Sequence, residues 1–206
     1  MAGVALIGAA TDVVEAGPSF CIIGMTVPTV APIPALVLEV ETSLGWLTPS
    51  LTSHPNAKCV GYTTEGWNFS ANTTDGASLS VDELDTPIRK ANSTSTPTAE
   101  GNLVSIWTPD ILETLFGLEQ LDGTSTFERY ADQVTSLTDI GVCWVWRRPK
   151  PNVPGAYQYR TLRFYRANQT NKFAGSIKNG ELFSVACKFE ALSQLGRTYE
   201  ISRWID

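Results

Sequence analysis

The side chains that could support nucleophilic catalysis are limited by the single histidine of this 206-residue chain. A Ser-His-Asp or Cys-His arrangement would need His54, because histidine is the usual general base that activates such nucleophiles. His54 lies in the segment SHPNAK, directly before Pro55. Proline after a short polar run is typical of a turn. We therefore expect His54 in a surface turn, and no catalytic site around it.

A second candidate for chemistry is the acidic group Asp82, Glu83 and Asp85 in the segment SVDELD. Paired carboxylates can exchange protons or bind Ca²⁺, but the residue order and the glycine of an EF-hand loop are absent. The chain also lacks a glycine-rich phosphate-binding loop. We expect a solvated acidic loop, and a protein that is not an enzyme and uses no metal or cofactor.

A third candidate is the segment WVWRRPKP, which combines Trp144 and Trp146 with Arg147, Arg148 and Lys150. Aromatic rings beside cations could stack on the bases of a nucleic acid and neutralise its phosphates. Both tryptophans, however, belong to an apolar run that alternates with period two from residue 140. A core strand covered on both faces is therefore the favoured interpretation.

The four cysteines, Cys21, Cys59, Cys143 and Cys187, are far apart in the sequence and form no CxxC pair. A chain of this length can bury a sufficient core without disulfides. We expect free, mostly buried thiols. The N-terminal sequence lacks the basic start of a secretion signal, and no apolar run approaches the roughly 20 residues that span a membrane.

Charge is distributed unevenly along the chain, whose net charge is −6. Residues 1–57 hold four acids and no Lys or Arg, residues 58–140 hold 13 acids and four cations, and residues 141–206 hold four acids and 11 cations. The favoured explanation is a solvated surface, because segregation along the sequence need not persist in space. The alternative is a pair of complementary surfaces for head-to-tail self-association.

Hydrophobic periodicity predicts a mostly β (α+β) fold, with two packed antiparallel sheets in a sandwich or barrel flanked by one short helix. Strands are expected at residues 36–40, in two runs around Glu65-Gly66, and at 103–107, 140–146, 157–165, 183–189 and 199–204. The helix should begin at Pro109, after the N-cap Thr108, and stop at Gly117. Asn179-Gly180 is a hairpin turn signal.

The first 35 residues are apolar and carry four prolines, Pro18, Pro28, Pro32 and Pro34. Because each proline removes a backbone donor, an ordinary core element is not expected here. We predict an N-terminal arm at residues 1–35 and a β-sandwich domain at residues 36–206. The arm is equally compatible with docking on a neighbouring subunit and with covering its own domain.

The order of these segments resembles the major tail (tail tube) proteins of long, flexible-tailed bacteriophages. The resemblance rests on GYTTEGWNFS at residues 61–70, an acidic stretch ending in LDTPIRK at 84–90, and NLVSIWTPDILETLFG at 102–117. The hairpin sequence SIKNGELFSVACKFEAL at 176–192 continues it. Residues 59–195 are covered, and the first 35 residues depart from the family pattern.

This resemblance implies a structural subunit that closes into hexameric rings, stacked into a tube whose channel passes double-stranded DNA without specific binding. It also implies tape-measure, tail terminator and tail-tip proteins as partners, the virion tail as location, synthesis in the host bacterial cytoplasm, and no membrane insertion. Within this hypothesis, the loop at residues 75–98 is an assembly element, because it is longer than the roughly 12–15 residues usual in compact domains. Its candidate residues are Asp75, Asp82, Glu83, Asp85, Pro87, Ile88 and Arg89.

Two other functions fit the sequence. One is a different phage structural protein, such as a tail terminator or a capsid decoration protein. The other is a secreted β-sandwich that binds carbohydrate, which would explain the aromatic residues and the Asn-x-Ser/Thr triplets that begin at Asn68, Asn72, Asn92 and Asn168.

Overall fold

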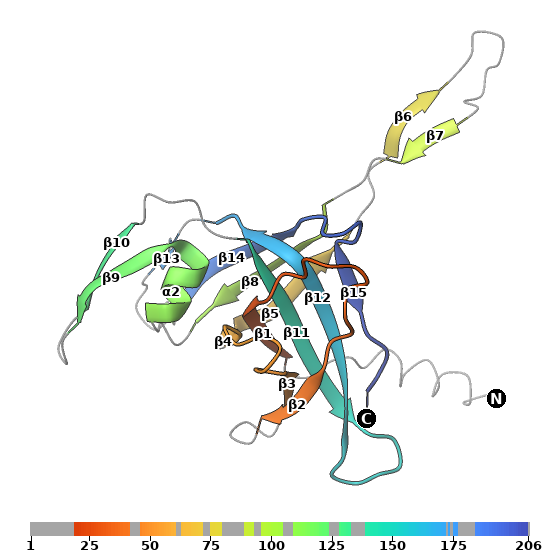
Figure 1. Ribbon diagram of the computed structural model, residues 1–206, viewed down its shortest axis with the longest axis horizontal. Helices are drawn as coiled ribbons and strands as arrows, with labels where there is room; N and C mark the ends of the chain where they lie inside the picture. The colour runs from red at the N-terminus through yellow and green to blue at the C-terminus, as the bar shows by residue number, and fades with distance from the viewer. Residues whose placement is uncertain are drawn as a thin grey trace.

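The structure is a computed structural model that describes residues 19–41, 46–60, 63–71, 75–79, 89–92, 96–104, 109–123, 128–132, 139–171, 173, 175–176 and 184–205. Over these residues it confirms the predicted fold class, a mostly β domain with one short helix (Figure 1). The main sheet contains β1 (Ser19–Met25), β4 (Lys58–Val60), β5 (Thr63–Ser70), β8 (Thr98–Leu103), β11 (Ile140–Pro149), β12 (Tyr157–Gln169), β13 (Gly175–Ser176), β14 (Ser184–Ala191) and β15 (Tyr199–Ile201). Three further pairs are β2 (Leu38–Glu41) with β3 (Trp46–Pro49), β6 (Asp75–Leu79) with β7 (Arg89–Asn92), and β9 (Leu118–Gly123) with β10 (Glu128–Asp132).

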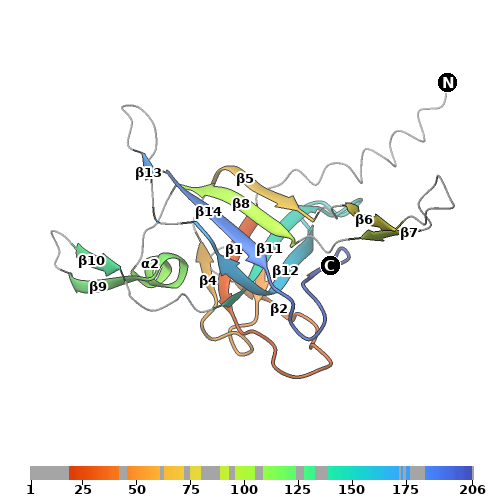
Figure 2. The ribbon, with the colours of Figure 1, turned by 90° about the horizontal axis from the view of Figure 1, so that it is seen from above.

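The two layers of the sandwich are two halves of one hydrogen-bonded sheet, in the order β4-β1-β11-β12-β14-β8-β5. The long strand β12 joins them. One of its edges pairs with β11, while its other edge pairs first with β15 at residues 162–164 and then with β14 at residues 167–169. The strands β14, β8 and β5 therefore cross over β1, β11 and β12 (Figures 1 and 2). Strands that pass from one layer to the other in this way are typical of steeply crossed sheet packing.

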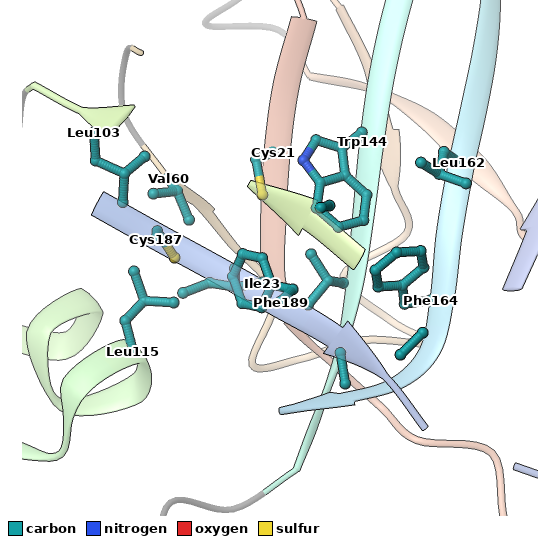
Figure 3. Packing of buried hydrophobic residues seen from close by; sticks show 14 of the residues in the cluster. Cys21, Ile23, Val60, Leu103, Leu115, Trp144, Leu162, Phe164, Cys187 and Phe189 are labelled. Carbon is teal, nitrogen blue, oxygen red and sulfur yellow. The ribbon is translucent and has the colours of Figure 1, made fainter. Parts of the chain in front are cut away.

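The main core lies between these two halves (Figure 3). Trp144 of β11 packs edge-on against Phe164 of β12, with ring centroids 4.9 Å apart, and against Trp67 of β5 at 5.5 Å. Phe164 and Phe189 are completely buried. The predicted alternation in β11, β12 and β14 is thus confirmed, since the inward positions of all three strands meet in one cluster.

The opposite face of β1 and β11 is also covered, as predicted for the strand that contains the tryptophans. Its buried residues are Ile22, Met25, Cys143 and Val145, which cluster with Tyr159 of β12, and Phe20, Leu36, Leu47 and Ala57 pack against them. The cover is supplied by the chain between β1 and β4, which includes the β2–β3 hairpin. Because both faces of β11 are buried, its sequence is a nearly continuous apolar run.

The helix α2 (Pro109–Phe116) has the predicted limits. Ile111, Leu112 and Leu115 are buried on its inner face, and Leu115 closes one end of the core. Gly117 ends the helix at φ 65°, where its N–H donates to the carbonyl of Glu113 at 2.9 Å. A left-handed residue after the last turn is the usual glycine stop.

The predicted N-terminal arm is wrong for its second half. Residues 19–25 form β1, an interior strand that lies between β4 and β11. Cys21, Ile22, Ile23 and Met25 are at most 3% exposed. The segment was misread because Pro18 and Pro28 lie just outside a short apolar strand and interrupt its pattern. Residues 1–18 lie outside the described residues.

Two further details differ from the sequence expectations, and a third expectation falls outside the described residues. The predicted turn at Glu65-Gly66 is a bulge inside the single strand β5, where Gly66 takes φ 79° and the pairing with β8 shifts. Of the strand expected at residues 103–107, only the first residue belongs to a described strand, β8, which begins earlier at Thr98, and residues 105–107 lie outside the described residues. Asn179-Gly180 lies outside the described residues, although β13 and β14 on either side of it pair antiparallel as a hairpin requires.

All four cysteines are free, as predicted, and only Cys59 is exposed. Burial raises the pKa of Cys143 and of Cys187 to about 12. A thiol with such a pKa is almost fully protonated near neutral pH, and the thiolate is the nucleophile. The interior cysteines therefore act as small apolar core residues.

Candidate assembly surfaces

The most prominent feature outside the core is a two-stranded ribbon formed by β6 and β7. Ser70 at the end of β5 is the partner of Thr98 at the start of β8, so the ribbon is inserted at the tip of the β5–β8 pair. It projects away from the body of the molecule (Figure 1). The base of the insertion is fixed to the core, where Pro97 is buried and its carbonyl accepts a 2.8 Å hydrogen bond from the Ala191 N–H.

The two strands of the ribbon lie within the predicted assembly loop at residues 75–98. Asp75 begins β6 and pairs with Asn92, while Arg89 begins β7 and pairs with Leu79. The described part of this segment is therefore an antiparallel strand pair, and these two candidate residues mark its two strands. The other candidate residues, Asp82, Glu83, Asp85, Pro87 and Ile88, lie outside the described residues.

A second hairpin, β9–β10, follows α2 and lies at the opposite end of the molecule from β6–β7 (Figures 1 and 2). Its first strand starts directly after Gly117, so the helix stop also sets where the hairpin leaves the body. The sequence favours a helical turn or a loop at residues 127–134, where the structure instead has strand β10. The Asp122-Gly123 turn signal is the only pattern that could have indicated this hairpin.

The main sheet also has edges. Strand β5 pairs only with β8, so among the described residues its other edge has no strand partner over Thr63–Ser70. An unprotected edge of this length is a template for pairing with another chain. The bulge at Gly66 is the one feature that breaks its regularity.

His54 is not a surface residue, in contrast to the sequence expectation. It lies in a turn, where its N–H donates to the Ser50 carbonyl at 2.9 Å, but its side chain is only 7% exposed. Its Nδ1 accepts a 3.2 Å hydrogen bond from the Thr26 N–H. This bond joins the two ends of the chain segment between β1 and β4, which covers one face of the sheet. Burial, and secondarily the positive charge of Arg163, lower the pKa of His54 below its ordinary value. The residue is a neutral structural acceptor.

The lowered pKa of buried His54 predicts that the folded protein loses stability in mild acid. Between the unfolded pKa of about 6.5 and the lower folded pKa, the unfolded chain binds a proton that folded His54 does not. The free energy of unfolding should fall with decreasing pH through this window, by at most about 1.4 kcal/mol per pH unit. Below the folded pKa of His54, this residue should cause no further decrease. Urea unfolding of wild type and His54→Asn between pH 8 and pH 4 measures the effect. Asparagine keeps an acceptor for the Thr26 N–H and does not titrate, so parallel stability curves would contradict the prediction.

A pocket of about 340 Å³ lies over β5, β8 and β14. Its polar lining includes Asn68, Glu100 and Asn102, and Glu100 forms a 2.7 Å ion pair with Lys188. Trp67 also lines it but packs its ring against Trp144 and Phe189 in the core, rather than presenting the ring as a platform for a sugar. The pocket offers hydrogen-bonding groups, but its aromatic residue is already used for packing.

The structure divides the segment WVWRRPKP into core and surface. Trp144 is 2% exposed and Trp146 packs against the core, which confirms the interpretation as a core strand. The arginines lie beyond the core on the β11–β12 ribbon and contact other rings. Arg147 lies over Tyr157 at 4.2 Å and Arg148 lies over Trp204 at 4.1 Å. No local sequence pattern predicts the second pair, because residue 204 is distant in sequence and only the final strand brings it beside the ribbon.

Among the described residues, no cluster of three or more His, Cys, Asp or Glu side chains could hold a metal ion. In the same part of the chain, no helix has the length and apolarity needed to cross a bilayer. Comparison with known proteins gave no matching family model and no matching curated protein.

Proposed function

We propose that this chain is a structural subunit of a bacteriophage tail tube, which assembles as stacked hexameric rings around a channel for DNA. Two independent lines support this proposal. The first is the ordered set of tail-tube-like motifs between residues 59 and 195. The second is a mostly β fold with elements that extend beyond its own core.

The observation that carries the proposal is the β6–β7 ribbon. An isolated two-stranded hairpin is only marginally stable in water, because it has no hydrophobic face to bury. This ribbon projects from the body and pairs only with itself in the described chain. A neighbouring subunit would supply the surface that the ribbon lacks, and the ordering entropy of its chain would be offset on assembly.

The charge of the chain supports the same function. A net charge of −6 disfavours tight binding of a phosphate backbone, whereas proteins that hold DNA neutralise it with clustered Lys and Arg. A conduit must let DNA pass without holding it. In a virion, the tube would also contact tape-measure, tail terminator and tail-tip proteins.

Electron microscopy of the purified protein tests the proposal directly. At high concentration we expect rings of six subunits, or tubes built from them, in negative stain. Sedimentation should show a matching population of large species. A protein that remains a dispersed monomer at every concentration and salt tested would contradict the proposed function and favour the carbohydrate-binding alternative, which binding to a glycan panel would then examine.

A further inference from the structure

The outer face of the layer formed by β5, β8 and β14 carries a row of polar side chains at the pocket of about 340 Å³ (Figure 2 shows the layer). Asn68 of β5 and Lys188 of β14 both lie directly opposite Glu100 of β8. Residues opposite each other in an antiparallel sheet share a face, and successive residues alternate between faces. The next residues along β5 and β14, Phe69 and Phe189, pack in the main core. The polar row therefore faces away from the core.

Small residues leave a hollow beside this row. Asn102 lies two positions after Glu100 and opposite Ala186 of β14, so all three share the outer face. Ala186 contributes only a methyl group, and Gly66 contributes no side chain to the lining. An added Cβ at Gly66 would meet no atom within 4 Å, so the space above the β5 bulge is open.

Asn171 completes the lining from the chain that leaves β12. The N–H of the preceding Thr170 donates to the Lys188 carbonyl at 2.9 Å, which holds this segment beside β14. Within the described part of the chain, the side-chain amides of Asn68, Asn102 and Asn171 have no hydrogen-bond partner. Each amide offers two N–H donors and one carbonyl acceptor. Three unoccupied amides therefore line one pocket.

The charge of the pocket is balanced. Glu100 is the one lining residue that is ionised at neutral pH, and it forms a 2.7 Å ion pair with Lys188. The thiol of Cys187 stays protonated, because burial raises its pKa to about 12. The lining contains no Lys or Arg, the residues that usually bind phosphates and carboxylates. A cationic ligand would have to compete with Lys188 for the carboxylate. The pocket thus favours a neutral ligand.

We propose that this pocket binds a neutral polyhydroxylated ligand, a single residue of a saccharide. Each sugar hydroxyl both donates and accepts hydrogen bonds, which matches the paired donors and acceptors of the three amides and the acceptor oxygens of Glu100. The volume lies at the lower end of the roughly 300–1,000 Å³ of small-molecule sites. Because the ring of Trp67 packs in the core, binding relies on hydrogen bonds and should be weak, with a Kd of about 1 mM.

Saturation-transfer NMR on the full chain tests the inference. This method detects signals of the free sugar, so it applies equally to a dispersed subunit and to a large assembly. The probes are glucose, galactose, mannose and N-acetylglucosamine, each at concentrations up to about 50 mM, well above the expected Kd. Glucuronate and inorganic phosphate are the charged comparisons. At least one neutral sugar should receive saturation from the protein, and should do so more strongly than either anion.

Two variants and one matched control locate the site. Ala186→Leu fills the hollow, and Asn68→Ala/Asn102→Ala removes two amides. Each variant should weaken binding of the sugar at least about tenfold, because the ligand then loses its space or two hydrogen bonds. Ala186→Ser keeps the residue small and should bind within about twofold of wild type. These side chains face away from the core, so all variants should fold, which thermal unfolding verifies.

Three outcomes would overturn the inference. The first is no saturation transfer to any of the four neutral sugars. The second is equal binding by wild type, Ala186→Leu and the double asparagine variant, which would place the sugar elsewhere. The third is preferential binding of glucuronate or phosphate. Electron microscopy decides the proposed function separately, because tubes without sugar binding would contradict only this inference, and a dispersed monomer that binds sugar would contradict only the tube.

Discussion

A variant that lacks residues 1–35 is expected not to fold. The deletion removes β1, which pairs with β11 along one edge and with β4 along the other. It also removes four buried side chains, those of Cys21, Ile22, Ile23 and Met25. Burial of one such side chain contributes roughly 1.5–3 kcal/mol, so their summed loss is comparable to the net stability of about 5–15 kcal/mol of a typical domain. Circular dichroism should show no cooperative thermal transition.

The matched control is a variant that lacks only residues 1–18 and retains the whole of β1. It should keep a cooperative transition close to that of the full chain, because every described contact of the sheet is still present. A folded protein without residues 1–35 would mean that β11 and β4 do not need the strand between them. That result would restore the original prediction of an arm that ends at residue 35.

Regular alternation made most of the fold predictable from the sequence. The runs in β11, β12 and β14 have a period of two and end in the same core, and the signals around α2 mark both of its ends. Local patterns failed where long-range pairing decides the structure. Strand β1 was missed because Pro18 and Pro28 flank its short apolar run, and only long-range pairing places that run between β4 and β11.

The candidate surfaces were less predictable. Excess length identified residues 75–98 as unusual, but the sequence did not indicate that Asp75 and Arg89 belong to the two strands of one ribbon. The stacking of Arg148 on Trp204 joins residues 56 positions apart, so no local motif contains it. Burial of His54 depends on Thr26, which tertiary folding brings close. Each of these features depends on strand pairing or tertiary contacts rather than on local composition.

Removal of the β6–β7 ribbon is expected to abolish assembly while leaving the subunit folded. Asp75 and Asn92 are directly opposite each other in the ribbon, so replacing residues 76–91 by Asn-Gly should close the chain with a tight turn. The ribbon pairs with no strand of the main sheet, and its base stays fixed through Pro97. The thermal transition should therefore shift little, whereas rings and tubes should be lost from negative-stain images and from sedimentation profiles.

A second variant separates the shape of the ribbon from its charge. Asp82→Asn, Glu83→Gln and Asp85→Asn keep both strands and remove three negative charges from the segment between them. If pairing with a neighbour depends on the ribbon's backbone, this variant should still assemble, because main-chain hydrogen bonds carry strand addition and side chains adjust its specificity. Loss of tubes in the charge variant alone would assign assembly to the carboxylates. Normal tubes after removal of the whole ribbon would show that assembly uses other surfaces, and the free edge of β5 would then be the next segment to block.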